Sequence, residues 1–134
     1  HSVNKSCIEN KKVILIDDSI VRGTTANKIV KMVYEAGAKE VHLGISCPPI
    51  MHPDFYGIDT PNYNELIAYK SDLKEMTRRV GAKSLFFLSL SGTYKAMGCK
   101  ERNPKTPQFT DHCFTGEYPI DVSEILEINK KINE

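Results

Sequence analysis

Two kinds of hydrophobic spacing alternate along the chain, and they are typical of strands and of amphipathic helices. Three short runs of mainly apolar residues predict strands, at 13–16, 41–45 and 84–90. Helical spacing of apolar residues predicts four helices, at 24–36, 64–69, 71–80 and 122–132. Strands that alternate with helices indicate a parallel α/β sheet, and the continuous apolar run at 13–16 indicates a strand that is covered on both faces.

The ends of these elements are predicted from single residues and from proline. We expect Thr24 or Thr25 to cap the helix predicted at 24–36 and Gly37 to end this helix. The prolines in 48–61 and 100–112 predict loops. On either side of the second loop we expect one helical turn, at 93–97, and a short strand, at 114–118. The later helices are expected to turn these residues inward: Leu73, Met76, Val80, Val122, Ile125, Leu126 and Ile132.

The composition is that of an ordinary globular domain or a piece of one. Apolar residues make up 40% of the 134 residues and charged residues 26%, close to the average for such domains. Lys and Arg number 18 against 17 Asp and Glu, so the net charge of +1 offers no basic surface to nucleic acid. No apolar stretch is long enough to cross a bilayer, and we expect a cytoplasmic protein without a membrane partner.

The first residue is His1 rather than methionine, and three strands make a small sheet for a doubly wound domain. We therefore expect an internal piece of a longer polypeptide. The cysteines form no Cys-x-x-Cys pair, which argues for reduced thiols rather than a zinc site or disulfides. Three of them are expected to be small buried side chains: Cys47, Cys99 and Cys113.

The candidate ligand site follows the first predicted strand, where Asp17 and Asp18 precede a short loop with Gly23 and a helix beginning near Thr24 and Thr25. Ligands of open α/β sheets bind beyond the carboxyl ends of the strands. A helix N-terminus favours an anion, glycine lets the backbone approach it, and threonine hydroxyls add donors. Ionised carboxylates only accept hydrogen bonds, so the acid pair suits a sugar diol or hydrated Mg²⁺. Together these residues predict a site for a phosphorylated sugar.

The segment 13–25, VILIDDSIVRGTT, resembles the 5-phosphoribosyl-1-pyrophosphate (PRPP) motif of type I phosphoribosyltransferases. Further segments resemble the amidophosphoribosyltransferase family in particular, namely 35–42, 46–50, 56–59, 65–68 and 114–119. The resemblance implies an α/β fold, a mostly parallel sheet flanked by helices. Residues 1–121 would form the C-terminal portion of the phosphoribosyltransferase domain and 122–134 a C-terminal helix. The glutaminase domain and the first half of the transferase domain would be absent.

By this resemblance, the complete protein is a glutamine amidotransferase and glycosyltransferase. It converts PRPP and glutamine to 5-phosphoribosylamine, glutamate and pyrophosphate, the first committed step of purine (IMP) biosynthesis. This piece is expected to supply the ribose 5-phosphate and Mg²⁺ binding loop, to hold no catalytic residue, and to be inactive alone. The implied partners are PRPP, ammonia derived from glutamine, purine nucleotide inhibitors, the remainder of the polypeptide, and further copies in a homo-oligomer.

The resemblance also implies the roles of individual residues. Asp17 and Asp18 would bind the ribose hydroxyls and Mg²⁺, and would favour positive charge at ribose C1 without transferring a proton. The other PRPP-binding residues would surround the 5-phosphate: Ser19, Val21, Arg22, Gly23, Thr24 and Thr25. Some members carry a [4Fe–4S] cluster, and its implied ligand positions hold Asp54, Pro107 and Thr110 here. Cluster ligation needs thiolates, so no iron–sulfur cluster is expected.

Two alternatives stay open at this point. A non-catalytic PRPP- or nucleotide-sensing module of a purine regulator reuses the same fold, but is expected to accompany a DNA-binding part with a basic face. A base-salvage phosphoribosyltransferase would share the acid-pair loop, but not the segments 56–59 and 114–119. Tyr56 and Asp59 lie in one of these segments and are expected to border the site, whereas His52 is expected to make a structural hydrogen bond.

Overall fold

A computed structural model describes residues 4–58, 60 and 62–132, with side chains described as far as residue 128. Its first elements are α1 (Lys5–Ile8), β1 (Lys12–Asp17), α2 (Thr24–Glu35), β2 (Glu40–Ile45) and the 3₁₀ helix η1 (Tyr63–Glu65). They are followed by α3 (Ile67–Lys70), α4 (Leu73–Val80), β3 (Ser84–Phe87), α5 (Leu90–Ala96), α6 (His112–Thr115) and α7 (Ser123–Ile132).

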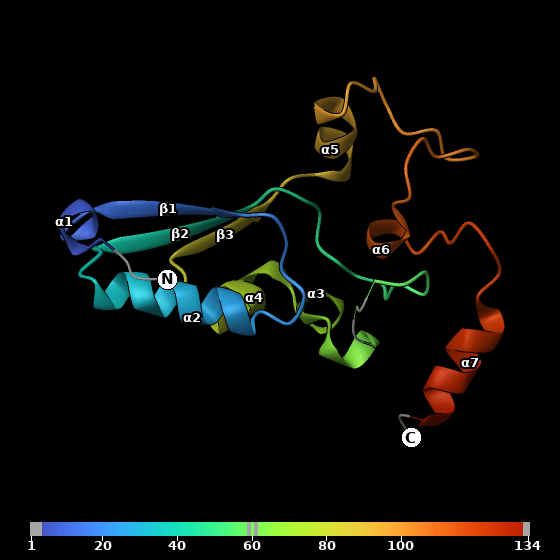
Figure 1. Ribbon diagram of the computed structural model, residues 1–134, viewed down its shortest axis with the longest axis horizontal. Coiled ribbons are helices and arrows are strands. Elements are labelled where there is room, and N and C mark those ends of the chain that lie inside the picture. Colours follow the sequence, from blue (N-terminus) through green and yellow to red (C-terminus); the bar gives the residue numbers. More distant parts are fainter. Residues whose placement is uncertain (1–3, 59, 61, 133–134) are drawn as a thin grey trace.

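The three strands form one parallel sheet in the order β1-β2-β3, which confirms the predicted α/β class. Helices α2 and α4 lie side by side on one face of this sheet (Figure 1). Right-handed crossovers place consecutive helices on the same face when each new strand is added on the same side. The core between sheet and helices contains Val30, Val41 and Val80, each at most 1% exposed.

The other face of the sheet is bare within the described residues. Ile14, Ile16 and Phe86 point to this face and are 65%, 69% and 48% exposed. The expectation that the first strand is covered on both faces is therefore wrong for this part of the chain. The reason is that both crossover helices lie on the opposite face of the sheet.

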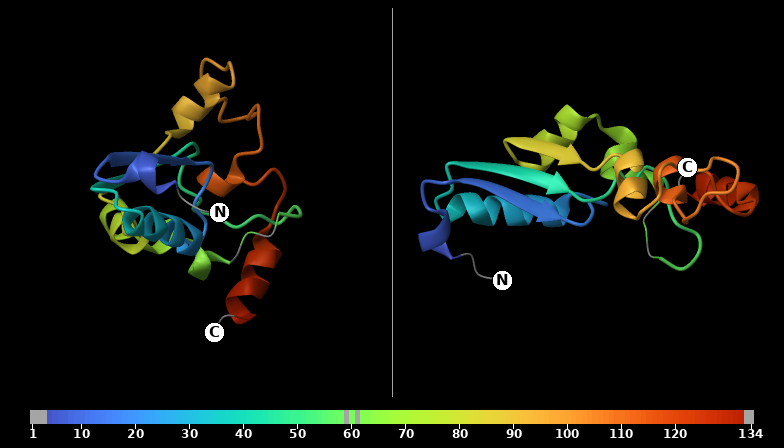
Figure 2. Two further views of the ribbon diagram at one scale, coloured as in Figure 1. Left: turned by 60° about the vertical axis from the view of Figure 1, so that its left-hand side comes forward. Right: turned by 90° about the horizontal axis from the view of Figure 1, so that it is seen from above.

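The segments after β3 extend beyond the carboxyl ends of the strands, with α5, α6 and α7 joined by long loops (Figure 2). The third strand ends at Phe87 rather than at residue 90, because Ser89 caps α5 and accepts a hydrogen bond from the N–H of Gly92 at 3.0 Å. Helix α5 therefore begins before the turn predicted at 93–97. The strand predicted at 114–118 is wrong, since α6 occupies its start and Gly116 ends that helix with a φ of 74°.

The helix predicted at 64–69 is two short helices, because Leu66 between η1 and α3 has an extended backbone. Helix α4 begins later than predicted, after Asp72, whose carboxylate accepts from the N–H of Glu75 at 2.7 Å. Leu73 and Ile125 are 50% and 40% exposed, so the prediction that they face inward is wrong. The side chain of Ile132 lies outside the described ones. None of the described helices has the length and apolar character needed to cross a membrane.

Candidate functional site

The acid pair lies where β1 passes into the loop that joins it to α2. A depression of about 360 Å³ opens there and is lined by residues 17–26 and Ile29. The lining includes every residue predicted for the site: Asp17, Asp18, Ser19, Val21, Arg22, Gly23, Thr24 and Thr25. The tertiary structure thus brings the whole predicted set around one hollow at the carboxyl end of a strand, where ligands of parallel sheets bind.

The two carboxylates shape the start of this loop and keep oxygen atoms for a ligand. Oδ1 of Asp17 accepts from the N–H of Asp18 at 3.0 Å, and Oδ1 of Asp18 accepts from the N–H of Ser19 at 2.7 Å. The N–H of Ser46 donates to the C=O of Asp17 at 2.9 Å and ties the loop to the end of β2. Within the described part of the chain, Oδ2 of either carboxylate accepts no hydrogen bond. Each side chain therefore presents one oxygen to a sugar hydroxyl or to a metal-bound water.

The donor set fits Mg²⁺, which the family resemblance implies. Mg²⁺ prefers oxygen ligands, keeps several waters, and is usually bound through one or two carboxylates. The free oxygens of Asp17 and Asp18 provide such a pair at the edge of an open depression. The described residues contain no group of three or more His, Cys, Asp or Glu side chains that would form a closed metal cage. The pair is thus suited to a hydrated ion shared with a substrate.

Gly23 sets the turn from the loop into α2. It directly precedes the helix with a φ of 80°, in the left-handed region that glycine tolerates. The expectation that Thr24 or Thr25 caps the helix is wrong, because Gly23 occupies the cap position and no side chain caps α2. Both threonines are exposed in the first turn and line the depression.

A segment far away in the sequence holds this loop from the other side. The N–H of Ile67 donates to the C=O of Val21 at 2.9 Å, and Nε of Arg22 donates to Oε2 of Glu65 at 2.7 Å. Sequence reasoning did not select Glu65 or Ile67 as site residues. The only signal was that both lie in 65–68, one of the segments that resemble the family.

The other candidate residues lie in the loop that follows β2, which contacts α6. Nδ1 of His52 and the hydroxyl of Tyr63 are 3.1 Å apart, which confirms a structural hydrogen bond. The ring of Tyr56 packs edge-on against His112, with centroids 5.0 Å apart, and it does not line the depression at the acid pair. Asp59 lies outside the described residues.

A buried contact holds this loop against α6. Nε2 of His112 lies 2.7 Å from Oδ1 of Asp54, and their side chains are 6% and 4% exposed. Burial raises the pKa of Asp54, but hydrogen bonds from the N–H groups of Ile58 and Tyr56 and from His112 lower it by more, so the pKa lies below its usual value. The carboxylate is therefore ionised at neutral pH although it is buried.

A second set of charges lies nearby around Asp111. Arg102 donates from Nε to this carboxylate at 2.5 Å and from Nη2 to Glu117 at 2.6 Å. The hydroxyl of Tyr94 donates to the same carboxylate at 2.7 Å. Burial raises the pKa of Asp111, while Arg102 and Tyr94 lower it below its usual value overall. Arg102 therefore bridges two carboxylates, and its single positive charge balances one of them.

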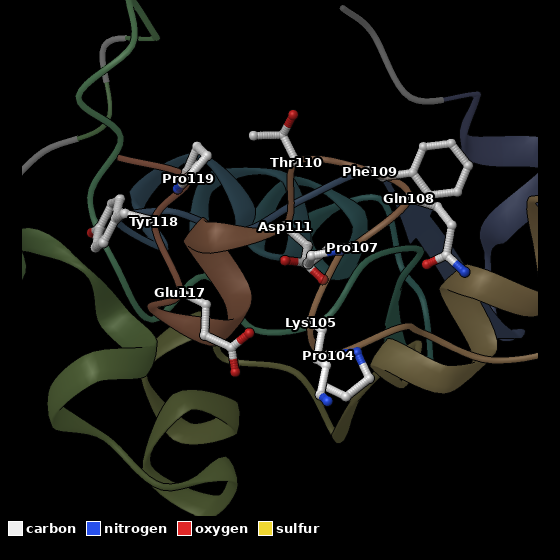
Figure 3. A pocket seen from close by; sticks show the side chains of 10 residues that line it. All are labelled: Pro104, Lys105, Pro107, Gln108, Phe109, Thr110, Asp111, Glu117, Tyr118 and Pro119. Carbon is white, nitrogen blue, oxygen red and sulfur yellow. The ribbon is translucent and has the colours of Figure 1, made fainter. Parts of the chain in front are cut away.

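Figure 3 shows a further depression, of about 570 Å³, beside these charges in the C-terminal part. Asp111, Glu117 and Lys105 are among its lining side chains. Both acids contact the same guanidinium of Arg102, and Glu117 remains exposed beside the depression. Pro107 and Thr110 also line it, two of the positions implied for a cluster ligand, and neither supplies a thiolate.

The cysteines are all free thiols, and Cys7 is exposed. Cys47, Cys99 and Cys113 are half-buried rather than fully buried as expected. Burial is the main cause that raises the pKa of Cys47, to about 11, and it also raises that of Cys113. These two thiols therefore stay protonated at neutral pH, which suits a structural role.

The sequence relatives of this chain include several amidophosphoribosyltransferases. A scan against protein-family models finds no match. The amidophosphoribosyltransferase of Rhizobium etli is 57% identical over 120 residues, which are 89% of this chain and 24% of that protein. The Bacillus subtilis amidophosphoribosyltransferase is 48% identical over 90% of this chain and 25% of its own length. A chloroplastic relative from Vigna aconitifolia is 45% identical over 87% of this chain.

Solved structures agree with the sequence relatives. The B. subtilis glutamine PRPP amidotransferase complexed with ADP and GMP superposes with a TM-score of 0.81 and 47% identity, over 92% of this chain and 27% of that one. A structure described as the allosteric regulatory enzyme of purine biosynthesis gives a TM-score of 0.77 and 43% identity. At this identity the likeness extends beyond the fold to the sequence, and the chain is homologous to the amidophosphoribosyltransferases, spanning about a quarter of their length.

Proposed function

We propose that this chain is the ribose 5-phosphate binding part of the phosphoribosyltransferase domain of an amidophosphoribosyltransferase. Such an enzyme converts PRPP and glutamine to 5-phosphoribosylamine, glutamate and pyrophosphate in purine biosynthesis. One observation carries the proposal. The acid pair, the Gly23 turn and the start of α2 surround one depression in a chain that is 57% identical to a relative of this name.

The acid pair is proposed to bind the ribose. The free oxygens of Asp17 and Asp18 accept hydrogen bonds from the two ring hydroxyls, which a neutral or cationic side chain could not do as well. Two negative charges beside the ring stabilise positive charge that develops at ribose C1 as pyrophosphate leaves. Mg²⁺, when bound, adds positive charge for the departing pyrophosphate. Neither carboxylate is assigned a proton transfer.

The loop and the start of α2 are proposed to bind the 5-phosphate. The first N–H groups of a helix have no partner inside the helix, and the helix dipole favours an anion there. Gly23 lets the backbone approach the phosphate oxygens, and the hydroxyls of Thr24 and Thr25 add uncharged donors. A purine nucleoside monophosphate carries the same ribose 5-phosphate, so we infer that inhibitory nucleotides use this site.

The remaining expectations extend the proposal to the whole polypeptide. Ammonia from glutamine, the other part of the polypeptide and further copies in a homo-oligomer are proposed partners. We propose a cytoplasmic location and no iron–sulfur cluster for this member. Some relatives are named as chloroplastic, so the location is not common to the family.

Calorimetric titration with GMP, with and without Mg²⁺, tests the proposal, with circular dichroism as the check on folding. We expect binding that is strengthened by Mg²⁺, and a loss of at least about tenfold in affinity for Asp17→Asn/Asp18→Asn, since hydrogen bonds to charged groups contribute about 1.5–3 kcal/mol each. Glu35→Gln is the matched control, an exposed acid of α2 that pairs with Lys31 at 3.9 Å. A folded chain that does not bind GMP, or binds it equally after the double substitution, would overturn the proposal.

A further inference from the structure

We propose that Glu65 is a positioning residue for the phosphate-binding loop. Its carboxylate holds the guanidinium of Arg22, a residue that lines both the acid-pair depression and the hollow beside Ile67. Together with Ile67, it fixes the backbone so that the N–H of Arg22 faces the phosphate. The inference rests on the function proposed above and deepens it, because it concerns the same site.

The backbone direction follows from one hydrogen bond. The C=O of Val21 accepts from the N–H of Ile67 at 2.9 Å, so this carbonyl points toward Ile67. In a planar trans peptide, the C=O and the following N–H point in opposite directions. Ile67 lines a neighbouring hollow of about 300 Å³, which shares Arg22, Gly23 and Thr24 with the acid-pair depression, but Ile67 itself does not line that depression. The N–H of Arg22 therefore points away from Ile67, and it donates to no other described residue.

The side chain of Arg22 is held by Glu65. Its Nε lies 2.7 Å from Oε2 of Glu65, a contact between segments 43 positions apart in the sequence. Both side chains are about half exposed, at 47% and 46%, so the pair adds little to overall stability. Its effect is local, because it restrains a long side chain next to the Val21–Arg22 peptide. The phosphate then meets backbone N–H groups and hydroxyls in a fixed arrangement.

A third contact shows how closely the segment 65–67 fits the loop. A Cβ on Gly23 would lie 2.6 Å from Cδ1 of Ile67, so the loop backbone packs directly on this side chain. Three independent contacts, to Val21, Arg22 and Gly23, therefore come from Glu65 and Ile67. Pre-organised donors bind an anion more tightly than mobile ones, because less conformational entropy is lost on binding.

Two substitutions of Glu65 separate geometry from charge. Glu65→Ala removes the acceptor for Arg22, and we expect GMP affinity to fall by about 1.4- to fivefold, the range set by exposed ion pairs. Glu65→Gln keeps an oxygen that accepts from Nε–H without the charge, so its affinity should stay close to that of the unmodified chain. The ³¹P resonance of bound GMP at saturation should shift for Glu65→Ala, because the phosphate then meets a differently arranged loop.

Glu75 offers a matched control. It accepts from Nε of Arg78 at 2.8 Å in another solvent-exposed pair, which lies on α4 and makes no contact to the loop. Glu75→Ala and Glu75→Gln should leave both the GMP affinity and the ³¹P resonance unchanged. Unchanged affinity for Glu65→Ala, or a fall without a ³¹P shift, would overturn the role of Glu65 alone. Failure of the unmodified chain to bind GMP would instead overturn the proposed function.

Discussion

Two regions of this molecule are stabilised by different kinds of interaction. The sheet region, residues 12–47 and 63–87, is built on an apolar core of strand and helix side chains. The C-terminal region, residues 89–128 together with the loop 48–58, buries Asp111 against Arg102 and His112 against Asp54. Its aromatic rings, such as Tyr118 over His112 at 5.1 Å, surround these polar groups rather than form a separate apolar core.

The difference matters for how each region responds to change. Apolar burial is non-directional and tolerates imperfect partners, so loss of one contact weakens a core gradually. A buried ion pair is favourable only while both partners are present, because removal of one leaves an unpaired charge away from water. We therefore expect the sheet region to depend on volume and the C-terminal region to depend on charge and pH.

The largest expected effect is a cavity in the sheet region. Leu43 is 2% exposed, and Leu43→Ala should lower the free energy of unfolding by about 2–5 kcal/mol, as for other buried leucines. Ile14→Ala on the bare face of β1 is the matched control and should cost less than about 1 kcal/mol, because Ile14 is 65% exposed. Urea unfolding followed by circular dichroism measures both. Equal losses would mean that the bare face is covered in solution.

The next effect is confined to the C-terminal region. Asp111→Ala leaves Arg102 and Tyr94 without their shared carboxylate, and we expect a loss of about 2–3 kcal/mol, below the usual range for broken buried pairs because Arg102 is 14% exposed and still reaches Glu117. Native-state hydrogen exchange should show faster exchange in α5 and α6 with little change in β1 and β2. Uniformly faster exchange in both regions would contradict the division.

A smaller effect is expected at the boundary of the candidate site. Gly23→Ala forces a side chain into a left-handed backbone with a φ of 80°, at a cost of about 1–2 kcal/mol. The added Cβ also lies 2.6 Å from Cδ1 of Ile67, so Gly23→Ala/Ile67→Val should recover the steric part of the loss and none of the backbone part. Thermal unfolding of the two variants measures this. No recovery in the double variant would show that Ile67 moves freely.

Acid should separate the two regions without any substitution. The folded-state pKa values of Asp54 and Asp111 lie below their ordinary values, so the folded state binds fewer protons than the unfolded state. The stability that they contribute is complete above about pH 4, the unfolded value, and is lost as pH falls through the lower folded values. Near-ultraviolet circular dichroism and exchange at α6 should change before exchange at β2. Simultaneous loss in both regions would argue against the comparison.

Thiol labelling gives the smallest perturbation and reports both regions at once. Cys7 is exposed and should react with iodoacetamide at pH 8, whereas Cys47, with a pKa near 11 because of burial, should react slowly. Cys113 lies in α6, and its labelling should accelerate in Asp111→Ala more than that of Cys47. Mass spectrometry of the labelled peptides measures the rates. Faster labelling of Cys47 than of Cys113 in this variant would contradict the prediction.

Sequence reasoning succeeded where a signal is local. The strand at 13–16, the helix from 24 and the acid-pair loop were predicted because spacing, glycine and carboxylates are read within a few residues. It failed where the structure of a segment does not follow the strand propensity of its own residues. Residues 88–90 are apolar enough for a strand, but Ser89 begins a helix there, and 114–118 has strand-forming residues in a segment that starts as α6.

The sequence by itself determined the α/β class, the order of the three strands with the helices α2 and α4 between them, and the residues that line the candidate phosphate site, since each depends on neighbouring positions. Only the tertiary structure decided that one face of β1 is bare, that Asp54 meets His112 across 58 positions, and that Glu65 and Ile67 hold the loop. These contacts join segments whose spacing in the chain carries no periodic signal. They arise because the fold places the carboxyl ends of the strands, the segment 63–67 and α6 at the same end of the sheet, where their polar groups need partners.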